Sequence, residues 1–277
     1  MIILSIPLLT LGLLYVNRAV SEPVMTRIET EIEAGGFKVG HIYEKPADRP
    51  FTFSGFFTNK VAGLSIEIHA GECDSAEVRH QVLSGWSHSA EANPLPERSL
   101  SGMPVGEHCY AVGSDLTEIE QGHFVLDREY AVCDRFRVEV EVQGHPQGTP
   151  AEILATQNLV AQWCERLTRE ILANAVALDL NDDGMAKAPA AVTGLETNKE
   201  GYVPLTKWAH DHGITVTYDE AAASASFVFR RKPVELILAS DRAVVGGRLV
   251  NLEGKFVLAR GSRWLVPDLE LTRAVAG

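Results

Sequence analysis

His210 and His212 are the first candidate metal ligands in the sequence, because only Asp211 separates them. A pair with this spacing ligates copper or zinc when both side chains lie on one side of the backbone, as they do on a strand. Here the pair falls near the end of an expected short helix, where residues two apart point in different directions. A solvated helix terminus, at which histidine suits the helix dipole, is therefore favoured over a copper site.

An acidic segment beginning at Asp179 matches the first half of a calcium loop. Asp179, Asn181 and Asp183 supply oxygen ligands at its first, third and fifth positions, and Gly184 follows at the turn. The twelfth position is Ala190 instead of the bidentate glutamate that completes such a site. A plain acidic linker is therefore favoured over calcium binding.

The chain has four cysteines, none of them in a C-x-x-C pair: Cys73, Cys109, Cys133 and Cys164. This spacing argues against a zinc ribbon or a thioredoxin-like site. An even number of cysteines favours disulfides in an exported protein, so all four are disulfide candidates, with buried thiols as the alternative. Cys164 lies on the apolar stripe of an expected long helix, where it either joins the helix to a sheet or fills the core.

Signatures of catalysis are missing from the sequence. The chain contains no Gly-x-Ser-x-Gly, no His-Glu-x-x-His and no glycine-rich phosphate loop. Glutamates two apart, such as Glu139 and Glu141, could act as an acid–base pair, but glutamate at alternate positions is also common on the solvent-exposed face of a sheet. We therefore expect a protein that is not an enzyme, with no catalytic residues and no cofactor.

Charge and the first segment bear on partners and location. The 25 basic and 37 acidic residues give a formal charge of -12, which disfavours binding to nucleic acid. Ile2 to Val16 is apolar apart from Ser5 and Thr10, a length typical of a signal peptide and short of the roughly 20 residues that span a bilayer. Residues 1–21 are expected to be a signal peptide, or an uncleaved membrane tether because no Lys or Arg precedes the apolar run. An extracytoplasmic location follows.

The length of 277 residues and the hydrophobic fraction of 45% suit two α+β domains. Residues 22–178 are expected to form the first, in which alternating strands at Leu64–His69 and Phe136–Val142 build a half-exposed antiparallel sheet. The sequence Thr149-Pro150-Ala151-Glu152 predicts the capping box of a long helix that packs on this sheet. The Ser/Asn/Pro-rich stretch from Ser87 to Met103 is expected to be irregular.

Residues 179–199 lack periodic apolar positions and are expected to be a linker. Residues 200–277 are expected to form a small domain with one short helix that ends at Gly213, packed on an antiparallel sheet. The strands of that sheet are expected at Ile214–Tyr218, Ser226–Arg230, Val234–Ala239, Ala243–Val245, Arg248–Leu252 and Trp264–Val266, with a hairpin at Gly246-Gly247.

The order of short motifs in this region is similar to that of a known domain family. In this chain the motifs are Val203-Pro204-Leu205, Gly213 after the short helix, Tyr218-Asp219, the strand at Val234–Leu238, Gly246-Gly247 and Val266-Pro267. Residues 201–269 thereby resemble the copper amine oxidase N-terminal-like domain, or stalk domain. Departures are the sequence Trp208–His212 in the helix, Gly246 where asparagine is usual, and no expected second helix and glycine after Pro267. The resemblance implies a compact helix-on-sheet module for anchoring or protein contact, without copper chemistry.

We therefore expect an exported, non-catalytic binding or scaffolding protein of the cell envelope, whose partner is a protein or an envelope polymer. Two alternatives stay open. One is an envelope hydrolase with its site in the first domain. The other is a sensor that responds to calcium through Asp179, Asn181 and Asp183, or to copper through His210 and His212.

Overall fold

The computed structural model describes residues 33, 38–44, 53–59, 64–73, 75–92, 103–113, 116–121, 127–144, 148–178, 180 and 200–277. These residues form helices and three antiparallel sheets, which confirms the predicted α+β class. The expected signal segment at residues 1–21 lies outside the described residues. So does the expected linker at 179–199, apart from Leu180.

The first sheet is antiparallel, with the strand order β1-β2-β3-β6-β5-β4. Burial alternates along its two central strands, because successive side chains of a strand point to opposite faces. Both central strands were predicted from that alternation. The strands are β1 (Lys38–Glu44), β2 (Phe53–Asn59), β3 (Leu64–Glu72), β4 (His108–Val112), β5 (Asp127–Cys133) and β6 (Phe136–Gly144).

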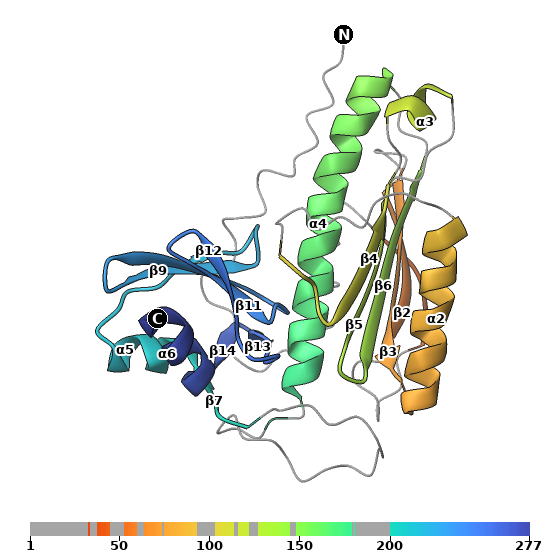
Figure 1. The fold of residues 1–277 in the computed structure, drawn as a ribbon. Helices are drawn as coiled ribbons and strands as arrows, with labels where there is room; N and C mark the ends of the chain where they lie inside the picture. The colour runs from red at the N-terminus through yellow and green to blue at the C-terminus, as the bar shows by residue number, and fades with distance from the viewer. Residues whose placement is uncertain are drawn as a thin grey trace.

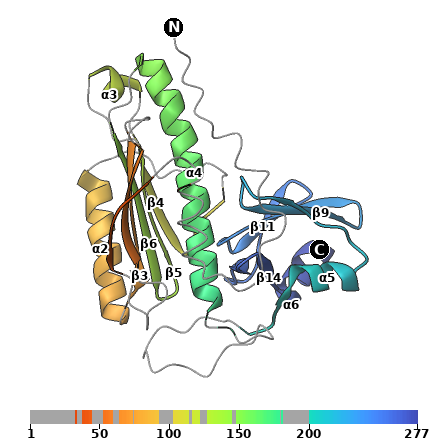
Figure 2. The ribbon, with the colours of Figure 1, turned by 180° about the vertical axis from the view of Figure 1, so that it is seen from behind.

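Helices cover both faces of this sheet (Figures 1 and 2). The long helix α4 (Pro150–Ala177) packs on one face and α2 (Ala76–Ala92) lies along the other, while the short α3 (Leu116–Glu120) lies near the start of α4. The predicted capping box of α4 is confirmed. The Thr149 backbone N–H donates to Glu152 Oε2 at 2.8 Å, and Glu152 N–H donates to Thr149 Oγ1 at 3.4 Å.

Helix α2 corrects the expectation of irregular structure from Ser87 onward, since it continues to Ala92. None of its residues from 76 to 86 is fully buried. A helix that buries so little apolar surface has no clear 3.6-residue pattern, and its serines, histidines and glycine are typical of loops.

The C-terminal residues form a five-stranded sheet of order β12-β11-β10-β9-β8 and a three-stranded sheet of order β13-β14-β7. Gly246 and Gly247 make the predicted hairpin, with φ angles of 59° and 79° that favour glycine. The elements are β7 (Tyr202–Pro204), α5 (Leu205–Asp211), β8 (Thr217–Asp219), β9 (Ser224–Phe229), β10 (Lys232–Ile237), β11 (Arg242–Val245), β12 (Arg248–Asn251), β13 (Leu258–Arg260), β14 (Arg263–Pro267) and α6 (Asp268–Ala276).

The helix α6 contradicts the expectation of a single helix in this region. It follows Pro267 directly and is followed by Gly277 at its C-cap. Leu271 and Val275, one helical turn apart, are fully buried. A helix of nine residues with so narrow an apolar stripe gives little periodicity in the sequence, which is why the pattern did not predict it.

Helix α4 packs on the C-terminal sheets as well as on the first sheet (Figures 1 and 2). Its residues Leu167 and Ile171 belong to the same cluster of buried side chains as Trp208 and Leu258. Polar contacts add to this joint, since Asn174 Oδ1 accepts from Gly261 N–H at 2.7 Å. The two parts of the chain therefore share one continuous core.

Candidate functional site

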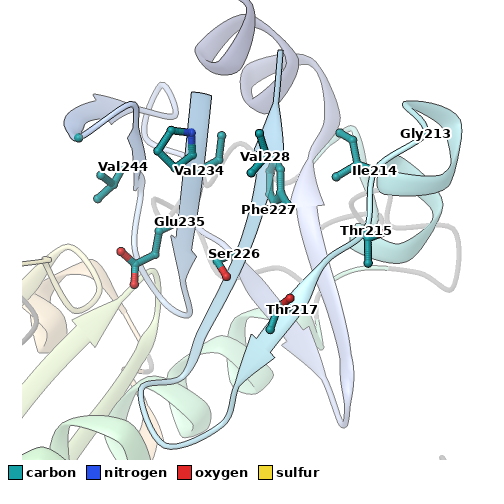
Figure 3. Close-up of a pocket in the computed structure, with 12 residues that line it drawn as sticks. Gly213, Ile214, Thr215, Thr217, Ser226, Phe227, Val228, Val234, Glu235 and Val244 are labelled. Atoms are coloured by element: carbon teal, nitrogen blue, oxygen red, sulfur yellow. The ribbon is translucent and has the colours of Figure 1, made fainter. Parts of the chain in front are cut away.

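A hollow of about 790 Å³ lies over the outer side of the five-stranded sheet (Figure 3). Strand register places one residue from each strand in a row across it. A second, shorter row joins Val228 and Pro233. Together the two rows define the outer sheet face, which consists of Thr217, Ser226, Val228, Pro233, Glu235, Val244 and Leu249.

This face is open because the opposite face of the same strands fills the core. Phe227 and Phe229 are buried against Trp208, with ring centroids 5.4 and 6.0 Å from the indole. Val228, between them on β9, must point the other way and is 62% exposed. Leu249 on β12 is 52% exposed. The two exposed side chains lie on one face of the sheet, with β10 and β11 between them.

Apolar side chains, a few hydroxyls and one carboxylate line the hollow. Glu235 is the single ionisable side chain among the residues that line it, beside hydroxyls such as Thr217 and Ser226. Ser226 lies directly opposite Glu235 on the neighbouring strand, and among the described residues no hydrogen bond joins their side chains. The arrangement can hold a ligand by apolar contact with a few hydrogen bonds.

Three side chains on the first sheet are hydrogen-bonded in series, and their types are those of a serine hydrolase. Ser54 Oγ lies 2.7 Å from Nδ1 of His69, and Nε2 of His69 lies 2.9 Å from Oε1 of Glu67. Nucleophile, base and orienting carboxylate meet in this order in serine hydrolases. Alternation along β3 places Glu67 and His69 on one face, but Ser54 joins them only because β2 pairs with β3. Reasoning from the sequence missed Ser54 for that reason.

A developing oxyanion needs N–H donors aimed at it. Both β2 and β3 are interior strands of the first sheet, so most of their backbone N–H groups bond to a neighbouring strand. The pairing of β1 with β2 shifts register beside Ser54, between Ile42 and Glu44. Ser54, His69 and Glu67 form a cross-strand polar chain on a sheet face, which links β2 to β3.

The structure places His210 and His212 in different surroundings. The side chain of His210 is 89% exposed and lies 3.5 Å from Asp211. The ring of His212 stacks on Trp208 at 4.3 Å, and its Nδ1 donates to the Trp208 carbonyl oxygen at 2.8 Å. That nitrogen carries a proton and is not available as a ligand. Helix α5 ends at Asp211, and His212 is its C-cap residue.

The calcium-ligand candidates Asp179, Asn181 and Asp183 lie outside the described residues. Within the part of the chain that the structure describes, no three His, Cys, Asp or Glu side chains are grouped to hold a metal ion.

No disulfide joins the four cysteines, all of which are described, and this corrects the disulfide prediction. Three of them fit the alternative of buried thiols, and Cys109 is partly exposed. Cys109 lies opposite Ala131, so Cys133 is its diagonal neighbour on the next strand. Diagonal partners are about 7–8 Å apart, farther than the Cα atoms of a disulfide. Cys133 and Cys164 are 1% and 0% exposed and belong to the core, while Cys73 is 1% exposed.

Comparisons with family models, with curated proteins and with solved structures found no match to this chain. Among the described helices, none is long and apolar enough to cross a bilayer.

Proposed function

We propose that this chain is an exported, non-catalytic binding or scaffolding protein of the cell envelope, and that it holds a protein partner on the outer sheet face. The observation that carries the proposal is the exposure of Val228 and Leu249 on the face opposite the core. The resemblance of residues 201–269 to stalk domains, which implies protein contact, supports it. So does the signal-like sequence at residues 1–21.

The outer sheet face offers apolar area on a rigid support. Burying a valine or leucine side chain is favourable by up to about 1.5–3 kcal/mol. The strand that carries Val228 is anchored by Phe227 and Phe229, which pack on Trp208, and the strand that carries Leu249 is paired with β11, so little order is lost on binding. A partner of this surface would present apolar side chains and a hydrogen-bond donor for Glu235.

Site-specific photocrosslinking in the native host tests this proposal. A photoreactive amino acid replaces Val228 in one variant and Leu269 in the other. Leu269, on α6, is a matched control because it is 54% exposed and does not belong to the outer sheet face. We expect a discrete crosslinked protein from position 228 and none from position 269, and its yield should fall when Leu249→Glu is added.

Two results would overturn the proposal. One is a position 228 that gives no adduct although the protein is present in the envelope fraction. The other is the same adducts from both positions, which would mean random collision.

Hydrolysis is a second candidate function, and the hydrogen bonds of Ser54, His69 and Glu67 favour it. A fluorophosphonate probe, which labels activated serines, discriminates between the two. Under the binding proposal we expect no labelling above that of Ser54→Ala. Labelling that depends on Ser54 and is lost in His69→Ala would instead identify a hydrolase.

A further inference from the structure

A second hollow, of about 190 Å³, lies between α4 and the C-terminal sheets. We call it the α4 cleft. Arg166 and Glu170, one turn apart on α4, form one wall. The end of β8, the turn after it and the strands β9 and β14 form the other. The volume suits one small polar molecule or one long side chain.

The walls of the α4 cleft are fixed relative to each other. The Arg169 guanidinium donates from α4 to the Leu238 carbonyl oxygen at 3.0 Å, and Leu238 lines the cleft. Asn174 holds the backbone of Gly261, another lining residue. Because Glu170 lies between these two attachment points on the helix, the cleft is formed before any ligand enters, and that lowers the cost of binding.

Two aromatic rings line the β8 side. Tyr218 and Trp264 meet edge to face, with ring centroids 5.6 Å apart and an interplanar angle of 63°. Partial burial raises the pKa of Tyr218 above its ordinary value, so its hydroxyl stays neutral at physiological pH. Aromatic faces attract ammonium and guanidinium groups, and tryptophan attracts them most strongly.

The charged groups of the cleft have an acidic excess. Arg166 Nη1 lies 3.6 Å from Glu170 Oε1, so this pair balances its own charge. Asp219 and Glu220, on the opposite wall, add two carboxylates, and Arg166 is the single basic residue of the lining. One oxygen of Asp219 accepts the Ala222 N–H at 3.1 Å, and its second oxygen has no such bond among the described residues.

Ser224 adds a polar group that the fold itself does not use. The residue is 5% exposed and lines the cleft. Its hydroxyl has no hydrogen-bond partner in the described part of the chain. The oxygen is not one of the fully buried polar atoms that lack a partner, so it reaches the open space of the cleft. A ligand that donates a hydrogen bond to Ser224 would take the place of water there.

We propose that the α4 cleft binds a small organic cation, an ammonium or guanidinium group of the size of a lysine or arginine side chain. Trp264 and Tyr218 face the cation, Asp219 and Glu220 balance its charge, and Ser224 accepts one of its hydrogen bonds. The cation comes either from a side chain of a bound protein or from a free amine. The proposal is independent of the partner at the outer sheet face.

Calorimetric titration of the full chain tests the proposal with N-acetyl-arginine amide and with N-acetyl-citrulline amide, whose neutral urea replaces the guanidinium. We expect saturable binding of the arginine compound and at least about tenfold weaker binding of the citrulline compound, equivalent to about 1.4 kcal/mol. Putrescine and a short arginine-containing peptide, titrated in parallel, distinguish a free amine from a protein side chain by which of them binds more tightly.

Variants locate the site. Asp219→Asn keeps the acceptor for Ala222 N–H while removing the charge, and Glu220→Gln is nearly isosteric. Together they should weaken binding of the arginine compound about tenfold at an unchanged melting temperature. Glu235→Gln removes one charge from the outer sheet face and should change nothing. The proposal is overturned if no cation saturates the protein, if citrulline binds equally well, or if Glu235→Gln weakens binding as much as the cleft variants do.

Discussion

Arg169 is the side chain on which the joint between the two parts of the chain most depends. It is 1% exposed, pairs with Glu165 at 2.8 Å, and donates to the backbone oxygens of Met103, Pro104 and Leu238. A buried guanidinium is stable only when its donors are satisfied, because removing its charge from water is costly. The one residue therefore fixes three segments of the chain.

Arg169→Met should lower the free energy of unfolding by about 3–5 kcal/mol, because it removes the guanidinium that balances the charge of the buried Glu165. Urea unfolding followed by circular dichroism measures the loss. The matched control is Arg273→Met, since Arg273 pairs with Glu253 at a site where both side chains are more than half exposed and should lose at most about 1 kcal/mol. Adding Glu165→Leu should recover part of the loss. An equal effect of the two arginine variants would show that the buried bonds do not stabilise the joint.

The cysteines should behave as protected thiols. Cys73, Cys133 and Cys164 are at most 1% exposed, whereas Cys109 is partly exposed. Iodoacetamide should therefore modify Cys109 first in the native protein, and all four only after denaturation without reductant. Peptide mass mapping under non-reducing conditions measures this and also reads the N-terminus, expected near Glu22. A linked pair of cysteine peptides would contradict the structure.

Single residues differ in how far the sequence predicts them. The capping box is predictable because Thr149 and Glu152 interact locally, three positions apart. The polar chain of Ser54 and His69 depends on which strand pairs with which and in what register, and that is decided by the whole sheet.

At the scale of elements, the start of α4 should show a pH-dependent contribution to stability. Hydrogen bonds from the backbone and side chain of Thr149 hold the pKa of Glu152 below its ordinary value. A group with a lowered pKa in the folded state stabilises fully above its unfolded value, about 4.3 for glutamate, and loses that contribution as the pH falls through the folded pKa.

Glu152→Gln keeps a capping group but cannot ionise, so its stability deficit should be present near neutral pH and vanish in acid. Thr149→Ala should cost about 1 kcal/mol near neutral pH, and Thr149→Ser should cost little. Urea midpoints at several pH values measure all three variants. A Glu152→Gln deficit that is constant with pH would show that the ionised carboxylate is not the stabilising form.

The elements predicted correctly are those with a strong local period. Apolar and polar residues alternate from Leu64 to Ala70 on β3 and from Phe136 to Val142 on β6, and β9 to β12 are separated by turn residues. The sequence did not predict the helices α2 and α6, because contacts with neighbouring elements hold them in place and their own residues show little helical periodicity. Trp86 is the contact of α2 with a small cluster of Tyr110 and Tyr130, and no run of apolar residues marks it.

The local sequence pattern does not predict the outer sheet face either. Alternation predicts that Val228 and Ser226 share a side of β9, but not which side the core occupies. That choice depends on α5, whose Trp208 covers the inner side. The sequence does not predict the α4 cleft at all, because its two walls come together only through packing between distant segments of the chain.

For the whole molecule, the shared core predicts one cooperative unfolding transition. Single-tryptophan variants that keep either Trp163, on α4, or Trp264, on β14, report on the two parts separately. Their fluorescence midpoints in urea should coincide with each other and with circular dichroism. Two separate midpoints would mean that the parts unfold independently in spite of their common core.

The ends of the segment between α4 and β7 are both attached to the C-terminal sheets. Arg260 Nη2 donates to the Leu180 carbonyl oxygen at 2.6 Å, and Lys255 Nζ donates to the Glu200 carbonyl oxygen at 2.8 Å. Lys255 also forms a buried pair with Glu270. We therefore expect the two parts to stay together when the backbone between Leu180 and Glu200 is cleaved. After cleavage at a protease site inserted there, the two fragments should co-elute in gel filtration and dissociate only in denaturant. The cleaved protein would then be a non-covalent heterodimer.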